Sequence, residues 1–320
     1  MFIDLPEPAL RTYRSAQTEP ADFDAFWSET LAESRAAAWA AERAPVRSGL
    51  ATLDVHDVTF AGYGGDPVRA WLRLPRGAQG PLPAVVQYIG YGGGRGHATD
   101  DLLWASAGFA HLTMDTRGQG SSWKTGDTED RHGTGPQFPG VMTRGIRDHR
   151  TYYYRRLYTD AVLAVDALRS MPEVDQDRVA VLGRSQGGGL ALAAGALADD
   201  VRAVIAQVPF LCDFPRALGL NDEPPYSEIT RYLAVHHDAV ESVHRTLSYF
   251  DGVNLARRGT AAASFSTGLM DATCPPSTVF GAFHEWRGPK EIEVWPYNGH
   301  EGGGSASDAN ALAMLQRLMA

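Results

Sequence analysis

Residues 178–197 read RVAVLGRSQGGGLALAAGAL, an apolar run, a serine between glycines and then a second, alanine-rich run. The first run is typical of a buried strand and the second of a helix. Gly183, Ser185 and Gly187 between them form the pattern G-x-S-x-G, a very tight turn where a Cβ at either glycine would collide with its neighbours. The stretch predicts a strained turn that presents Ser185 at the carboxyl edge of a sheet and the N-terminus of a helix. A purely structural glycine-rich turn is the alternative.

The rest of the chain repeats this alternation of strand and helix. Short continuous apolar runs are typical of strands buried on both faces of a parallel sheet. Between them, the segment 155–170 places Leu157, Ala161, Val165 and Leu168 on one helix face. The pattern predicts an α/β fold with a doubly wound, mostly parallel sheet. The predicted strands are AVVQYIG at 84–90, FAHLTMD at 109–115, RVAVLG at 178–183, AVIAQV at 203–208 and ASFSTGLM at 263–270.

The N-terminal part of the chain has a different pattern. Residues 1–50 predict an extension on the outside of the domain. Apolar and aromatic residues within 22–44 recur at helical spacing, with Asp22 or Asp24 as the helix N-cap. Residues 53–75 then alternate in polarity on either side of the turn-like GYGGDP, which predicts a β-hairpin.

Two long insertions interrupt the alternation of strands and helices. Residues 117–150 form a glycine-rich connection, and residues 212–258 are helical in pattern. Insertions of this length are commonly lids or walls of a binding cleft, so we expect a helical cap at 212–258. Since the sequence contains neither a repeat nor a low-complexity linker, a single domain over 1–320 is the simplest organisation.

The composition excludes several classes of partner. The 320 residues include 29 Lys and Arg against 38 Asp and Glu, a net charge of −9, without a basic run that could follow a phosphate backbone. The first fifteen residues lack a signal-peptide pattern, and nowhere do about eighteen apolar residues run together as a membrane span requires. We therefore expect a cytoplasmic protein that binds neither nucleic acid nor membrane.

A serine hydroxyl attacks efficiently only when a base removes its proton. In the α/β-hydrolase fold, the nucleophile is followed along the chain by an acid and then by a histidine. Of the histidines after Ser185, only His300 lies in a glycine-rich loop after a final strand, within EIEVWPYNGHEGGG. His236 and His237 are adjacent in the helical insertion and cannot share a helix face, which indicates surface residues or lid contacts. His300 is therefore the predicted general base.

The predicted acid is Asp271. It directly follows the strand at 263–270, which places it at the same sheet edge as Ser185 and before His300 in the chain. Asp213, Asp222 and Glu301 lie in the insertion or too near the histidine, so loop bracing or a place on the surface is the better reading of them.

Acyl transfer also needs donors for a developing oxyanion. We expect these to be the backbone N–H groups of Gln186, after the nucleophile, and of Tyr91 in the loop QYIGYGGGRG. A merely flexible turn is the alternative for this loop.

The sequence offers no cofactor motif. The loop QYIGYGGGRG lacks the Lys-Ser/Thr ending of a phosphate-binding loop, and Cys212 and Cys274 do not have the CxxC spacing of a zinc site. We therefore expect neither a nucleotide, nor a metal, nor any other cofactor.

Twelve motifs in a fixed order extend over nearly the whole length of the chain. They are DLPEPALRTYR, FDAFW, DVTFAGYGG, VVQYIGYGGGRG, MDTRGQGSS, MTRGIRD, TYYYRRLYTDAV, SQGGG, VPFLCDF, RTLSYFDGVN, GLMDATCPPSTVF and GPKEIEVWPYNGHEGGGS. Through these motifs the sequence resembles a known family: the acetyl xylan esterases and cephalosporin C deacetylases of carbohydrate esterase family seven. The resemblance implies an α/β-hydrolase that removes acetyl groups from short xylo-oligosaccharides and from cephalosporin C. It implies the same triad and oxyanion positions, and a ring-shaped homohexamer that admits only small substrates.

The sequence departs from the family pattern in places, and two arginines near the expected site need an interpretation. Arg184 precedes the nucleophile where relatives usually have a small residue, and the segment before the Asp271 strand lacks the usual Ile-Pro. Arg184 either adds a cation beside the site or braces neighbouring structure, and bracing is the expected role. Arg117 in RGQG is expected to hold its loop through its planar donors, with substrate contact as the alternative.

The sequence leaves three functions to compare. The first is hydrolysis of small acetyl esters by Ser185, His300 and Asp271. The second is a peptidase of the prolyl-oligopeptidase type, which shares the triad order, although this chain has no room for the propeller domain that filters peptides there. The third is a non-catalytic binding module on the same fold.

Overall fold

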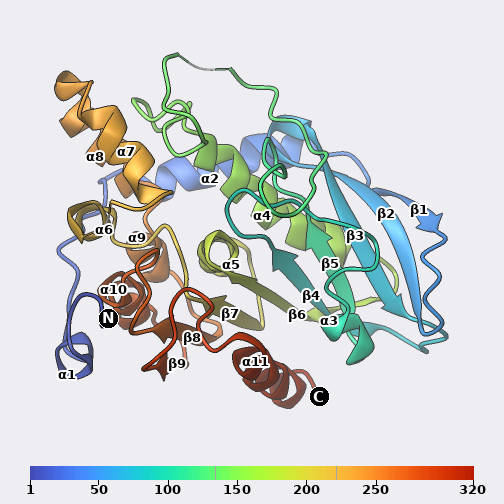
Figure 1. The fold of residues 1–320 in the computed structure, drawn as a ribbon. Coiled ribbons are helices and arrows are strands. Elements are labelled where there is room, and N and C mark those ends of the chain that lie inside the picture. Colours follow the sequence, from blue (N-terminus) through green and yellow to red (C-terminus); the bar gives the residue numbers. More distant parts are fainter. Residues whose placement is uncertain (134, 221) are drawn as a thin grey trace.

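The computed structural model describes residues 1–133, 135–220 and 222–320. Within these residues one sheet of nine strands runs through the molecule in the order β1-β2-β3-β5-β4-β6-β7-β8-β9 (Figure 1). The strands are β1 (Glu42–Val46), β2 (Leu53–Ala61), β3 (Pro67–Pro75), β4 (Leu82–Tyr88), β5 (Ala110–Met114), β6 (Val174–Arg184), β7 (Ala203–Gln207), β8 (Ala262–Gly268) and β9 (Lys290–Trp295).

The six strands from β5 to β9 are parallel, and β1, β2 and β3 extend the sheet with antiparallel pairings. The α/β class and the mostly parallel sheet are confirmed, as is the hairpin of β2 and β3. All five strands predicted from apolar runs are present. Because parallel strands share one carboxyl edge, the loops after β4, β6, β8 and β9 come together at that edge.

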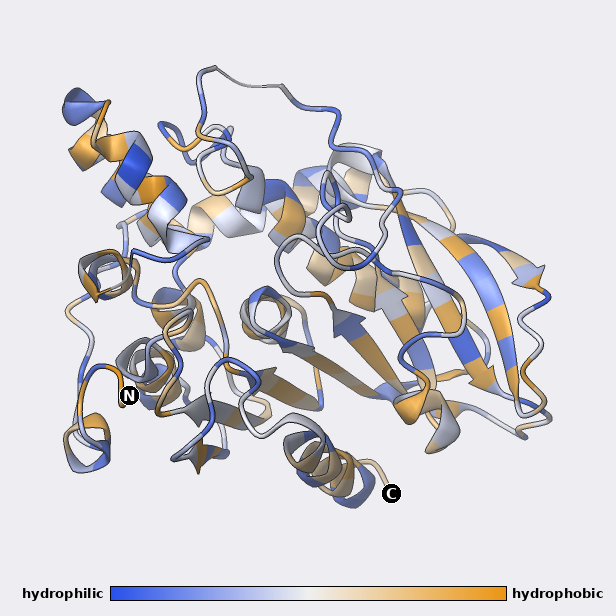
Figure 2. Cartoon of the chain, in the orientation of Figure 1, coloured by the Kyte–Doolittle hydropathy of each residue, from blue (hydrophilic) through white to orange (hydrophobic). Residues whose placement is uncertain are grey.

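Helices cover both faces of the sheet (Figure 1). On one face, α4 (Tyr153–Arg169) and α5 (Gln186–Leu197) pack on a core that includes Val86, while α11 (Gly304–Leu318) and α3 (Leu103–Ser106) pack on the other face against Val85. Figure 2 shows hydrophobic residues along the central strands between these layers. The four residues predicted to share one face of the 155–170 helix are all buried.

The predicted insertion at 212–258 is helical. It contains α6 (Phe214–Leu220), α7 (Tyr226–Leu233), α8 (Val240–Ser248) and α9 (Gly252–Ala256), with a short 3₁₀ turn, His237–Ala239, before α8. α7 and α8 project from the body of the molecule on the side of the carboxyl edge (Figure 1). The chain then returns to the sheet through β8, and α10 (Pro276–Glu285) packs beside α9.

The N-terminal extension differs from the prediction. Besides α1 (Glu7–Leu10), its long helix α2 (Phe23–Ala36) ends eight residues before the predicted boundary at residue 44, and residues 42–46 form the edge strand β1. Backbone pairing with β2 outweighs the helix propensity of this segment. Asp22 occupies the N-cap position, but its carboxylate accepts from the Tyr249 hydroxyl instead of capping the helix.

Arg117 connects three segments beneath the carboxyl edge. Its guanidinium is fully buried and donates to Asp160 of α4 at 2.8 Å and to Asp66 at 3.1 Å, where the hairpin turn ends. The bracing role expected for Arg117 is confirmed, and its burial excludes direct contact with substrate.

Replacing Arg117 by Met is expected to lower the free energy of unfolding by about 3–5 kcal/mol, because the Asp160 carboxylate would remain buried without its cation. Urea denaturation followed by circular dichroism measures the change. The control is Arg43→Ala, which removes an exposed ion pair with Glu173 and should cost about 1 kcal/mol or less. Equal losses in the two variants would contradict this account of Arg117.

Candidate active site

Ser185 lies at the turn between β6 and α5, with φ 58° and ψ −122°. This left-handed conformation is strained for a residue other than glycine. A Cβ on Gly183 would overlap the Gly187 carbonyl, and a Cβ on Gly187 would overlap the backbone of Tyr88. The predicted turn is therefore confirmed: the two glycines are required by close backbone contact, and the strain is concentrated on the serine.

A chain of hydrogen bonds connects Ser185 to His300 and Asp271. Nε2 of His300 lies 2.9 Å from the Ser185 hydroxyl oxygen, and Nδ1 lies 2.9 Å from Oδ2 of Asp271. Asp271 follows β8 and His300 lies in the loop after β9, so the sheet edge brings the three together. The arrangement allows the imidazole to take a proton from the serine while the carboxylate fixes its tautomer.

Asp271 is itself held by its own loop. The residue is fully buried, and its Oδ1 accepts backbone N–H bonds of 2.8 Å from Thr273 and Cys274. One carboxylate oxygen therefore fixes the orientation of the group, and the other is directed at His300. Two N–H donors also compensate the carboxylate for its loss of hydration.

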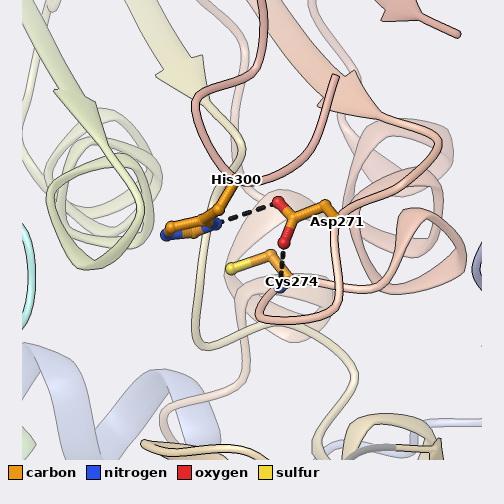
Figure 3. A group of neighbouring side chains, drawn as sticks. All are labelled: Asp271, Cys274 and His300. Atoms are coloured by element: carbon orange, nitrogen blue, oxygen red, sulfur yellow. Dashed lines mark hydrogen bonds and ion pairs between the residues drawn. The ribbon is translucent and has the colours of Figure 1, made fainter. Parts of the chain in front are cut away.

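Cys274 is a neighbour of the triad that the sequence reasoning did not identify. Among the described residues, Asp271, Cys274 and His300 place potential metal ligands within 4.8 Å of one another (Figure 3). However, the ligand atoms of Asp271 and His300 already bond to each other, and burial raises the pKa of the Cys274 thiol well above its usual value. The geometry suits proton transfer better than coordination, since a metal would need the thiolate.

The loop after β4 brings Tyr91 to the same cavity as Ser185 and His300, a space of about 530 Å³. The Tyr91 hydroxyl donates to Glu228 of α7 at 2.7 Å and accepts from the backbone N–H of Val141 at 2.8 Å. Burial raises the pKa of both Tyr91 and Glu228. The loop is thus fixed by contacts with both insertions, which does not fit a merely flexible turn.

Gln119 connects this loop to the nucleophile turn. Its Oε1 accepts from the backbone N–H of Gly92 at 2.6 Å, and its Nε2 donates to Oε1 of Gln186 at 2.9 Å. The Gln119 side chain therefore connects the loop that carries Tyr91 to the side chain of Gln186. The sequence reasoning considered only the arginine of the RGQG motif, although the conspicuous glutamine in it was the available signal.

The sequence model of the family described as Acetyl xylan esterase (AXE1) matches residues 1–318. The chain belongs to this family. It is a carboxylic ester hydrolase that acts on acetyl esters, and the resemblance seen in the sequence is confirmed.

Solved structures agree with this assignment. The acetyl xylan esterase from Paenibacillus sp. R4 is 39% identical to this chain and superposes on it with a TM-score of 0.93. The match covers 98% of this chain and 100% of that one. Acetyl xylan esterase 1 from Thermoanaerobacterium sp. JW/SL YS485 is 35% identical with a TM-score of 0.91, covering 98% and 99%.

Two further relatives define the limits of the comparison. Acetyl esterase Axe7A of Xylanibacter ruminicola is 30% identical over 305 residues, which is 92% of this chain but 66% of that protein. The Pyrococcus horikoshii acylaminoacyl peptidase is 16% identical with a TM-score of 0.61, covering 85% of this chain and 42% of its own. The peptidase shares the fold alone.

The rejected candidates lie outside the triad of the esterase. His236, in the turn after α7, is half-buried and its Nδ1 lies 3.1 Å from the Arg147 guanidinium, whereas His237 and Asp222 are exposed. Asp213 accepts from the Tyr13 hydroxyl, and Glu301 accepts hydrogen bonds from residues of its own loop. The predictions of surface positions or loop bracing are confirmed for these residues.

Arg184 braces the esterase at the loop that carries His300. Its guanidinium donates to the backbone carbonyls of Glu301 and Gly304, and it pairs with Asp308 of α11 at 3.1 Å. The residue before Ser185 thus holds the residues on the C-terminal side of His300. This bears out the bracing role expected from the sequence.

Replacing Arg184 by Ala is expected to lower kcat for p-nitrophenyl acetate about tenfold, because small displacements of a catalytic group are costly. KM should change little, and stopped assays over a range of ester concentrations separate the two constants. Arg202→Ala is the matched control, since Arg202 donates to Leu318 at the far end of α11. A kcat equal to that of the control would disprove the positioning role.

Proposed function

We propose that the esterase removes O-acetyl groups from short acetylated xylo-oligosaccharides, with cephalosporin C as a further substrate, through an acyl-enzyme on Ser185. The main support is the chain of hydrogen bonds that joins Ser185 to His300 and His300 to Asp271. Ser185 lies at the strained turn, and Ser185 and His300 line a cavity of about 530 Å³. Membership of the acetyl xylan esterase family supports the choice of acyl group and sugar.

In the proposed first half-reaction, the Ser185 oxygen attacks the acetyl carbonyl carbon while His300 Nε2 takes the hydroxyl proton. The backbone N–H groups of Tyr91 and Gln186 stabilise the oxyanion of the tetrahedral intermediate. The C–O bond to the sugar then breaks, and the sugar oxygen leaves with the proton from His300. The acetyl group remains on Ser185.

In the second half-reaction, His300 removes a proton from water, and the resulting hydroxide equivalent attacks the acetyl carbonyl. Collapse of this second intermediate releases acetate and returns the proton to Ser185. Asp271 orients the imidazole and stabilises the imidazolium in both steps. The chain's own residues balance every proton, so the mechanism requires no cofactor.

The walls of the cavity favour a short acyl group. Tyr91, Pro224 and Pro225 line it, and rigid walls of this kind resist rearrangement around a long chain. Phe210 is fully buried and packs behind the Tyr91 ring at a centroid distance of 6.4 Å. Phe210 therefore affects the length of the acyl group that fits by fixing the position of the Tyr91 ring.

None of the described helices is long and apolar enough to cross a bilayer. The homohexamer implied by the family resemblance, and the cytoplasmic location, stay predictions. Light scattering coupled to size-exclusion chromatography tests the first.

Replacing Ser185 by Ala is expected to lower kcat for p-nitrophenyl acetate at least about 10⁴-fold, since the remaining residues cannot form an acyl-enzyme. Acetylated xylotriose, cephalosporin C and a prolyl amide, assayed with the wild-type enzyme, separate the ester activities from a peptidase activity. An organophosphonate should label the wild type and the control Ser242→Ala, a serine on α8, but not the Ser185 variant. Full activity of the variant, or hydrolysis of the amide alone, would overturn the proposal.

Replacing Asp271 by Asn is expected to lower kcat about 10⁴-fold with little change in KM, because the amide favours the wrong imidazole tautomer. Asp222→Asn, at one of the rejected acids, should retain wild-type kinetics. Comparable losses in the two variants would show that the acid is misassigned.

A further inference from the structure

A second cavity, of about 370 Å³, adjoins the catalytic cavity. It lies at the carboxyl edge of β4, β6 and β7, on the side of the sheet covered by α3 and α11. Gly90, Trp123 and Arg184 line both cavities, so the two spaces share a wall beside Ser185. A substrate whose ester lies at Ser185 can therefore extend in this direction.

Trp123 is an exposed aromatic residue held in a fixed position on the shared wall. The residue is 63% exposed, yet its indole N–H donates to the Tyr91 carbonyl at 2.9 Å. The ring also lies against the glycine loop, where a Cβ on Gly93 would approach it to 2.6 Å. An exposed ring that is already ordered can pack against a ligand with little further loss of side-chain entropy.

The polar wall of the second cavity is electrically balanced. Lys124 pairs with Asp101, and Arg184 pairs with Asp308 at 3.1 Å. Gln207 donates to the same Asp308 carboxylate at 2.9 Å, so the polar groups hold one another in place. In the described lining both cations are already paired, which favours a neutral ligand with several hydroxyl groups over an anion.

We infer that the second cavity binds the neighbouring sugar ring of a neutral oligosaccharide whose acetylated ring lies at Ser185, with an apolar face of that substrate against Trp123. This inference rests on the proposed deacetylation of sugars and names the part of the substrate that the enzyme recognises beyond the ester. Cephalosporin C carries carboxylate groups, so it gains no comparable binding from this balanced wall.

The first test compares chain lengths with the wild-type enzyme. An acetylated methyl xyloside, acetylated xylobiose and acetylated xylotriose carry the same ester on one, two and three rings. We expect kcat/KM to rise about tenfold from one ring to two, which corresponds to about 1.4 kcal/mol, and to rise little with the third. Equal values for one and two rings would overturn the inference.

The second test fills the cavity without touching the triad. Leu103 of α3 lines the second cavity, is 41% exposed and is not part of the catalytic cavity wall. Leu103→Trp should raise KM for acetylated xylobiose about fivefold to tenfold by occupying the space of the second ring. The variant should leave the methyl xyloside and p-nitrophenyl acetate within about twofold. The control Leu220→Trp, at a leucine on α6 that is also 41% exposed and lines neither cavity, should leave all three within that range.

Competition provides a measurement that does not depend on turnover of a sugar ester. Unacetylated xylobiose should inhibit p-nitrophenyl acetate hydrolysis by the wild type, and more weakly in Leu103→Trp. Inhibition that is absent, or equal in the two enzymes, would overturn the second cavity as a sugar site while leaving the esterase assignment intact. If wild-type enzyme hydrolyses p-nitrophenyl acetate but none of the acetylated sugars, the proposed function itself fails.

Discussion

The contact between the nucleophile turn and the end of β4 determines the rest of the site. Gly183, Gly187 and the backbone of Tyr88 approach so closely that side chains are excluded, and the left-handed strain is thereby confined to Ser185. This packing also places the start of α5 beside the loop after β4. The nucleophile and the expected oxyanion donors are consequently positioned by one set of backbone contacts, before any polar side chain contributes.

Polar side chains then connect the remaining loops to that turn. Gln119 joins it to the Tyr91 loop, and Arg184 joins it to the loop of His300. These connections come from the ends of different strands, which meet only because the sheet is parallel there. The contacts that hold Ser185 and His300 therefore converge on one turn, while each of them comes from a separate part of the chain.

The sequence predicted those features whose cause is local. A few residues of sequence are enough to recognise the glycines of the turn, each apolar strand and the position of Asp271 after its strand. The expected order of nucleophile, acid and histidine along the chain then gave the rest of the predicted site. The edge strand β1 was missed because ERAPV has no alternation of apolar residues and is fixed only by pairing with β2. Gln119 and Glu228 were missed because their partners lie in distant segments of the chain, and spacing along a chain does not encode such contacts.

Tyr91 connects the loop after β4 to α7. Its backbone belongs to the loop beside Ser185, while its hydroxyl is bonded to Glu228 on α7. An outward movement of α7 would have to break that bond or displace the loop. The position of α7 and the position of the Tyr91 loop are therefore thermodynamically linked, so that each stabilises the other.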